Sequence, residues 1–146
     1  MLRTRRSIVS SIRLLLADDN LEILEMLVDM LQPTYAVTAA LSDGTSVLQQ
    51  APILNPDLII LDISLGEMTG FDVARRLQKA GVTAKVIFLT VHENVDFVRA
   101  AFDAGAAGYV YKSRISSDLL DAIVTTCAGG RFSSADVAAS SSSSPH

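Results

Sequence analysis

The sequence predicts an α/β fold, in which helices cover both faces of a parallel sheet of five strands. Two observations support this prediction. From residue 11 onward, short apolar runs alternate with segments of helical period, as in βαβ units. The run LIILD, residues 58–62, is apolar up to its last residue, which is typical of a central strand covered on both faces.

The predicted strands are the five short apolar runs. They cover residues 12–17, 35–41, 57–61, 85–89 and 107–111. Polar residues directly follow three of these runs, at Asp18, Asp62 and Thr90, so the apolar pattern also marks where those strands end. Five strand–helix units follow.

The predicted helices lie between and after these runs. In the first, apolar residues recur on one face from Leu21 to Leu31, Asn20 is a candidate N-cap, and Pro33 follows the end. Residues 71–77, 95–102 and 115–124 repeat the pattern, and each segment is followed by a glycine. The remaining helix, residues 43–50, has few apolar anchors and is expected to end near Pro52.

A chain of 146 residues fits one domain with one core. Residues 1–10 form a basic leader, residues 11–131 the folded domain, and the Ala/Ser-rich residues 132–146 a flexible linker or tail. The leader has no small-residue cleavage site after it, which disfavours a signal peptide. No run of 18 apolar residues is present, so no membrane-spanning helix is expected.

Charge and cysteine usage limit the partners and the compartment. The net charge of −4 disfavours nucleic-acid binding by this chain and favours protein partners. The single cysteine, Cys127, excludes an intrachain disulfide and favours a reducing, cytoplasmic compartment. Its place in an apolar pattern predicts a small buried side chain.

Polar side chains close several of the predicted strands. Asp18 and Asp19 follow the first run, Asp62 the third and Thr90 the fourth, while the fifth leads to Lys112. Ligands of open parallel sheets bind outside the carboxyl ends of the strands, so these groups are expected at one rim. Carboxylates that lie close together repel one another unless a cation lies among them, and oxygen ligands suit Mg²⁺ or Mn²⁺.

With a metal bound, one carboxylate can attack phosphorus while the metal and a lysine neutralise charge on the transferring group. Asp62, the acid that ends the central strand, is one candidate for this nucleophile. Lys112 would supply the point charge, and Thr90 could donate its hydroxyl to a phosphoryl oxygen.

Four segments carry a resemblance to a known family. LLLADDN, LIILDISLGEMTGFDVARRL, VIFLTVHENVDFVRAAFDAGAAGYVYKS and SDLLDAI resemble the response-regulator receiver family, over residues 12 to about 130. GAAGYVYK, SDLLDAI and GGRF are most similar to LuxR-type (NarL/FixJ-type) regulators. The fold is then expected to be flavodoxin-like, a doubly wound (βα)₅ domain with strand order 2-1-3-4-5.

The resemblance implies a role for each matching residue. Asp18, Asp19, Asp62 and the backbone carbonyl of Ser64 would hold the metal, and Asp62 would be phosphorylated by a sensor histidine kinase. Thr90 would be the switch hydroxyl, Tyr109 the switch aromatic and Lys112 the family's lysine. Ser64 and His92 would tune dephosphorylation, although an exposed loop histidine is an equally good reading of His92.

The implied output is a change of surface. Thr90 would move toward the phosphoryl group, and Tyr109 would then turn inward and repack the surface of the fourth helix, fifth strand and fifth helix. A homodimer could form there or through another helix face. The helix-turn-helix domain of LuxR-type regulators is absent, so DNA binding is expected only of a longer protein.

The sequence departs from the family at two positions beside the site. Gly66 stands where the family usually has proline, and Ser113 follows Lys112 where many receivers have a cis proline. A different placement of Lys112 is one consequence to test.

Three other functions fit parts of the pattern. A pseudo-receiver would keep the fold as an interaction module without phosphorylation, and the two departures leave room for it. A flavin-binding domain of the same order would need a phosphate-binding first loop, where Asp18 and Asp19 repel phosphate. An aspartyl phosphatase would need a second acid two residues after Asp62, where Ser64 stands.

Overall fold

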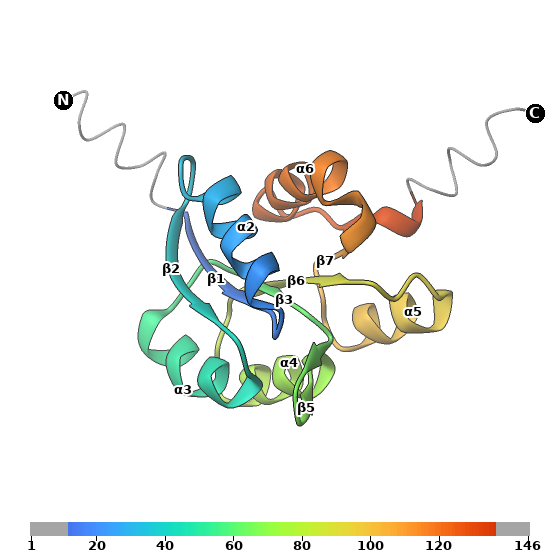
Figure 1. The fold of residues 1–146 in the computed structure, drawn as a ribbon. Coiled ribbons are helices and arrows are strands. Elements are labelled where there is room, and N and C mark those ends of the chain that lie inside the picture. Colours follow the sequence, from blue (N-terminus) through green and yellow to red (C-terminus); the bar gives the residue numbers. More distant parts are fainter. Residues whose placement is uncertain (1–11, 137–146) are drawn as a thin grey trace, which may run out of the picture.

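A computed structural model describes residues 12–136 of the chain as one α/β domain, in which helices flank a central sheet (Figure 1). The predicted leader and residues 137–146 of the predicted linker lie outside these residues. The main sheet has the order β2-β1-β3-β6-β7-β8, and every neighbouring pair is parallel. Its first five strands confirm the predicted order 2-1-3-4-5.

The strands begin and end within a residue of the predicted apolar runs. They are β1 (Arg13–Ala17), β2 (Ala36–Leu41), β3 (Leu58–Leu61), β6 (Lys85–Thr90) and β7 (Gly108–Tyr111). All four residues of β3 are buried, as predicted for the central strand. Its neighbours in the sheet are β1 and β6.

The helices divide between the two faces of the sheet. They are α2 (Leu21–Leu31), α3 (Gly44–Leu54), α4 (Gly70–Lys79), α5 (Val95–Asp103) and α6 (Ile115–Cys127). Helices α2 and α6 lie over one face and α3, α4 and α5 over the other (Figure 1). Alternate residues of β1 pack into the two cores on either face of the sheet. Leu14 and Leu16 face α2 and α6, and Leu15 faces the layer of α3, α4 and α5.

Local sequence explains how α2 begins and how α3 ends. The Asn20 side chain accepts a hydrogen bond from Ile23 N–H, which confirms the predicted N-cap of α2. Helix α3 runs four residues beyond its predicted end and includes Pro52. The buried Val47 and Ala51 hold its inner face against the sheet, and Asn55 ends it in the left-handed region at φ 49°.

Residues 132–136 are part of the folded domain. Strand β8 (Phe132–Ser133) pairs with β7 as a sixth strand, and a helical turn follows over residues 134–136. The prediction of a linker from residue 132 is therefore wrong for residues 132–136. Composition alone predicted flexibility there, whereas Ser133 and Ser134 are buried and make hydrogen bonds inside the domain.

Cys127 is another correction, because its side chain is exposed near the end of α6 rather than buried. The apolar pattern continues to Ile123 and the small buried Thr126, and Cys127 falls on the next, outward position. Within residues 12–136, no helix has both the length and the apolar character that crossing a bilayer requires.

Candidate functional site

Three carboxylates meet at the carboxyl ends of adjacent strands. Asp18 directly follows β1 and Asp62 directly follows β3, and these two strands pair side by side. One carboxylate oxygen each from Asp18, Asp19 and Asp62 lies within 4.8 Å of the others. Asp18 and Asp62 are buried and Asp19 is exposed, so the cluster has a solvent side. The structure therefore brings together the three acids that the sequence predicts at this rim.

The oxygens of Asp18 fit a metal site. Oδ1 accepts a 2.8 Å hydrogen bond from Asn20 N–H, which fixes the carboxylate at the start of α2. Oδ2 is buried and lies 2.7 Å from the Lys112 ammonium, although it accepts no hydrogen bond of good geometry from the described residues. A buried carboxylate oxygen is costly unless a cation lies beside it, and Lys112 is the cation that the structure shows there. Hard oxygen ligands of this kind suit Mg²⁺ or Mn²⁺.

Lys112 supplies the ammonium of the site. Its Nζ lies 2.7 Å from Asp18 Oδ2 and donates a 3.2 Å hydrogen bond to Asp62 Oδ2. Burial favours the neutral amine, but contact with Asp18 and Asp62 outweighs it and raises the pKa of Lys112. The peptide bond to Ser113 is trans, as are all those described. Lys112 thus reaches both acids without the cis proline that the family usually has.

Burial is the main cause that raises the pKa of the Asp62 carboxyl above its ordinary value, and the nearby Asp18 charge adds to it. Lys112 and the backbone N–H of Ser64 act in the opposite direction. Asp62 is therefore an acid that has too little positive charge around it in the protein alone. A divalent cation would supply that charge.

A short hairpin follows Asp62. Strands β4 (Ser64–Leu65) and β5 (Met68–Thr69) pair antiparallel, and Gly66 begins the two-residue turn between them with φ 75°. Proline, which fixes φ near −65°, cannot adopt this turn, so the glycine comes with a different loop geometry. Ser64 is exposed in this hairpin. Its role as a carbonyl ligand of the metal stays a prediction.

Thr90 and Tyr109 both contact the backbone of His92. The N–H of His92 donates to Thr90 Oγ1 at 3.1 Å, and the Tyr109 hydroxyl donates to the His92 carbonyl oxygen at 2.7 Å. Thr90 and Tyr109 are both fully buried. Tyr109 thus points inward, and its burial raises the pKa of the phenol. Hydrogen bonds from β6 and from β7 therefore both fix the backbone of His92, in the loop after β6.

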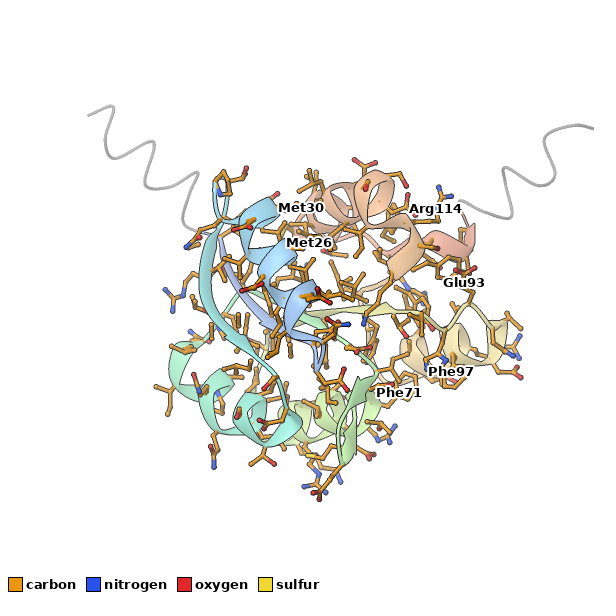
Figure 2. The ribbon with its side chains drawn as sticks, viewed as in Figure 1. Met26, Met30, Phe71, Glu93, Phe97 and Arg114 are labelled. Carbon is orange, nitrogen blue, oxygen red and sulfur yellow. The ribbon has the colours of Figure 1, made fainter. Side chains whose placement is uncertain are left out.

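Aromatic rings hold the His92 side chain at the surface. The imidazole stacks on Phe97 with 4.3 Å between ring centroids, and Phe97 in turn stacks on Phe71 at 6.3 Å. Figure 2 shows Phe71 and Phe97 side by side where α4 and α5 approach each other. His92 is half exposed, so its imidazole borders the site from the β6–α5 loop without entering the acid cluster.

Two contacts beside the site were not predicted from the sequence. Ser113 Oγ donates a 2.9 Å hydrogen bond to Glu93. This bond joins the segment that follows Lys112 to the loop that follows Thr90. Gly70 N–H donates to the Ile63 carbonyl at 2.6 Å, and a Cβ on Gly70 would overlap the Asp62 carbonyl oxygen. The pattern Thr69-Gly70 at a helix start was the available signal for the second contact.

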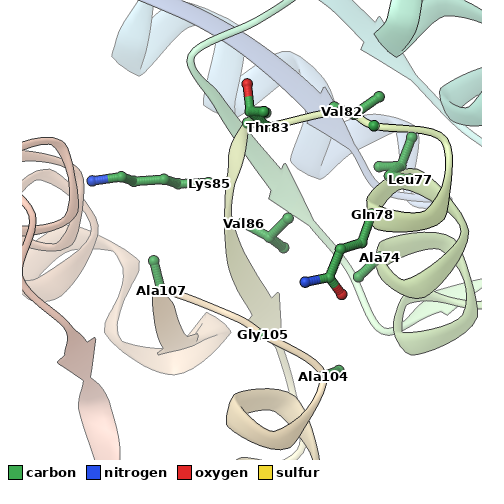
Figure 3. A pocket seen from close by; sticks show the side chains of 12 residues that line it. Ala74, Leu77, Gln78, Val82, Thr83, Lys85, Val86, Ala104, Gly105 and Ala107 are labelled. Carbon is green, nitrogen blue, oxygen red and sulfur yellow. The ribbon is translucent and has the colours of Figure 1, made fainter.

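A separate cavity of about 450 Å³ lies near the amino end of β6, away from the carboxyl ends of the strands where the acids meet (Figure 3). It opens between α4, the start of β6 and the turn after α5, and Ala74, Leu77 and Val86 line it. Its only ionisable lining residue, Lys85, points away and donates to the Thr126 carbonyl oxygen at 2.8 Å. Lys85 begins β6 whereas Thr90 ends it, so this cavity is not part of the acid site.

Comparison with protein families identifies the domain type. Residues 14–124 match the response regulator receiver domain. Two similar curated proteins are the nitrate/nitrite response regulator protein NarP of Escherichia coli (strain K12), 39% identical over 101 residues, and the transcriptional regulatory protein DegU of Brevibacillus brevis, 28% identical over 102 residues. These matches cover 69% and 70% of this chain, but only 47% and 43% of the relatives. The chain thus spans about half of their length.

Solved structures agree with this match. A LuxR-family two-component response regulator from Aurantimonas sp. SI85-9A1 has a TM-score of 0.80 and 31% identity, over 86% of this chain and 91% of that one. The isolated receiver domain of RcsB from Salmonella enterica serovar Typhimurium, solved with the phosphomimetic BeF₃⁻, has a TM-score of 0.74, 21% identity and coverage of 84% and 92%. The second likeness supports the fold alone.

Proposed function

Because the chain belongs to the response regulator receiver family and is similar to a LuxR-family response regulator, we propose that Asp62 accepts a phosphoryl group from a phosphohistidine of a sensor histidine kinase. The observation that carries this proposal is the position of the Asp62 carboxylate, which lies at the rim beside the buried Asp18, the exposed Asp19 and the Lys112 ammonium. The chain is then a phosphoryl acceptor, not an enzyme that turns over small substrates.

The transfer requires one bond to form and one to break. An Asp62 carboxylate oxygen attacks phosphorus, the phosphorus–nitrogen bond of the donor breaks, and the imidazole leaves with the bonding electrons. Asp18, Asp19, Asp62 and the Ser64 carbonyl would hold Mg²⁺ or Mn²⁺. When bound, the metal supplies positive charge to the transferring phosphoryl oxygens. Lys112 holds a second positive charge at the same oxygens.

Thr90 is suited to bind the product. Its Oγ1 accepts from His92 N–H, so the hydroxyl proton stays available to donate to a phosphoryl oxygen. A shift of Thr90 toward Asp62 would break this contact and move the loop that Tyr109 also holds through the His92 carbonyl. We propose that the surface of α5, β7 and α6 changes in this way, and that Ser64 and His92 tune the lifetime of the phosphoryl group.

The partners and the output are proposed from the relatives. The relative DegU is a transcriptional regulatory protein of which the match covers only 43%, so a DNA-binding output in a longer protein would carry the response. The negative net charge supports protein contacts by this part, with the kinase or a second copy, rather than contacts with DNA. The cytoplasmic location stays a prediction.

An adduct experiment tests the proposal. The chain is incubated with Mg²⁺ and a small acyl phosphate donor, and intact mass is measured for wild type and Asp62→Asn. We expect one acid- and base-labile phosphoryl adduct on the wild type and none on the variant. An unmodified wild type, or equal modification of both proteins, would contradict the proposal and favour the pseudo-receiver function.

A further inference from the structure

A second buried polar cluster lies outside the acid site, where β7, α6 and the chain after β8 meet. The Ser134 hydroxyl donates a 2.7 Å hydrogen bond to Asp118 Oδ2 and accepts one of 3.1 Å from Tyr111 N–H. Ser134 is fully buried and Asp118 is 3% exposed. We name Tyr111, Asp118 and Ser134 the C-terminal latch. A single serine hydroxyl thus joins the end of β7 to α6.

Further contacts hold the Asp118 end of the latch. Arg114 Nε donates to Asp118 Oδ2 at 2.8 Å, and Ser117 Oγ donates to Oδ1 at 3.0 Å. Figure 2 shows Arg114 and Glu93 at the same corner of the molecule, where η1 (Lys112–Arg114) leads into α6. Glu93 also accepts the Ser113 hydrogen bond, so this corner joins the β6–α5 loop to the latch.

The chain around Ser134 is fixed to the same elements. Strand β8 pairs with β7 through Gly108↔Phe132 and Tyr109↔Ser133. The Arg131 guanidinium lies 4.2 Å from the centre of the Phe102 ring on α5, a cation–π contact. The segment from residue 131 to 136 therefore contacts α5, β7 and α6 together, which is the surface proposed to change on phosphorylation.

The latch is also adjacent to the acid site. Tyr111 pairs with Thr90 across β7 and β6, and Lys112 is the next residue. The Tyr111 ring packs edge-on against the inward Tyr109 ring, with 6.1 Å between centroids. Tyr111, whose N–H donates to Ser134, is thus next to Lys112 in the chain. It also lies directly opposite Thr90 in the sheet.

We propose that the latch couples occupancy of the Asp62 site to the chain segment of residues 132–136, so that this segment reports phosphorylation to the polypeptide beyond it. Lys112 and Thr90 bound to a phosphoryl group fix the end of β7, which keeps Tyr111 N–H directed at Ser134. Coupling of this kind is reciprocal, so a broken latch must weaken binding at the site. The inference rests on the proposed function.

Hydrogen exchange tests the first direction in the unmodified chain. Amide exchange is measured for wild type with Mg²⁺ alone and with Mg²⁺ plus beryllofluoride, a phosphoryl mimic. We expect slower exchange at Tyr111 and in residues 132–136 when beryllofluoride is bound. Protection confined to residues around Asp62, with no change at Tyr111 or in residues 132–136, would overturn the latch.

Affinity tests the reverse direction. Ser134→Ala removes both latch bonds, and Ser116→Ala is the matched control because Ser116 is an exposed serine on α6, the helix that carries Asp118. We expect Ser134→Ala to weaken beryllofluoride binding by roughly fivefold or more, the lower end of measured couplings between sites, with no effect of Ser116→Ala. A merely structural role would lower the unfolding temperature and leave the affinity of the folded protein unchanged.

The two proposals fail in different ways. Wild-type affinity that Ser134→Ala does not change would overturn the latch and leave the function of Asp62 standing. Failure of the wild type to bind beryllofluoride and to form the phosphoryl adduct would overturn the proposed function, and the latch with it.

Discussion

The Lys112 ammonium lies 2.7 Å from Asp18 Oδ2, closer than the 3.2 Å that separates it from Asp62 Oδ2. Lys112 therefore neutralises the acid on the first strand as well as the proposed nucleophile. Its side chain is 12% exposed and those of the two acids are 2% and 5% exposed, so the three charges interact with little screening by water.

Replacing Lys112 should consequently destabilise the fold. Lys112→Ala leaves Asp18 and Asp62 buried without their cation, and loss of one partner of a buried pair costs roughly 3–5 kcal/mol. We expect lower stability in urea unfolding at neutral pH, with part of the loss recovered by Mg²⁺. Lys79→Ala, on the exposed end of α4, is the control and should change stability little. Equal stability of the two variants would show that the buried charges are not paired as described.

The opposite effect is expected at Asp62. Its folded-state pKa lies above the ordinary Asp value of 3.8, so folding favours the protonated acid. Below pH 3.8 the acid is protonated in both states and costs nothing. Stability is lost as pH rises from 3.8 through the folded-state pKa, and the full cost remains above it. Asp62→Asn should therefore stabilise the metal-free chain at pH 7.

Urea unfolding without metal, from pH 7 down toward pH 4, measures this gain. The difference between Asp62→Asn and wild type should shrink as pH falls. Asp121→Asn, which removes an exposed aspartate from α6, is the matched control. A gain at Asp62 that is independent of pH would disprove the charge explanation.

Magnesium should stabilise the wild type through the same acids. A ligand that binds only the folded state raises stability by RT ln(1 + [L]/Kd), so the unfolding temperature should rise with Mg²⁺ concentration. Asp19→Asn leaves the buried Asp18 and Asp62 in place but removes the exposed ligand, and should reduce the rise. Thermal unfolding across a Mg²⁺ titration measures both, and an identical rise in the variant would exclude Asp19 as a ligand.

The sequence predicted the sheet because its strands are short apolar runs with clear ends. The rim acids Asp18 and Asp62 were predicted for the same reason, since each closes a run and adjacent parallel strands end at one edge. Strand β8 was missed because it has two residues, too few for a periodic pattern. Its position depends on Ser134 reaching Asp118 from a distant part of the chain, which local sequence does not encode.

The geometry beside Asp62 was likewise beyond the sequence. Ser113 in place of proline cast doubt on Lys112, yet the trans peptide leaves Nζ within reach of both acids. Cys127 was expected to be buried because it falls in an apolar-patterned segment, but it lies one residue beyond the buried Thr126, and a one-residue difference on a helix turns the side chain outward.

Asp118 should show the pH dependence of a stabilising acid. Burial alone would raise its pKa, but hydrogen bonds from Arg114, Ser134 and Ser117 hold the pKa below the ordinary value of 3.8. Its contribution is thus fully present above pH 3.8 and is lost as pH falls through the lower folded-state pKa. Asp118→Asn should cost roughly 1–3 kcal/mol at pH 7, and unfolding curves of the two proteins should converge in acid. A constant difference down to low pH would contradict this.

Gly70 should prove essential to the position of Asp62. A Cβ at residue 70 would overlap the Asp62 carbonyl oxygen and lie 3.0 Å from the Phe88 ring, so Gly70→Ala must displace the backbone that carries the nucleophile. Overpacking of this kind costs roughly 1–3 kcal/mol. We expect lower stability together with at least tenfold weaker beryllofluoride binding, measured by titration under conditions where the variant is folded.

Gly81→Ala is the matched control for this substitution. Gly81 has φ 82°, where alanine is strained, but open space surrounds its Cβ position and it lies near the amino end of β6, beside the cavity of Figure 3. The control should lose stability, by roughly 1–2 kcal/mol, and bind beryllofluoride as wild type does. Equal loss of binding in both variants would mean that reduced stability, not displacement of Asp62, accounts for the effect of Gly70→Ala.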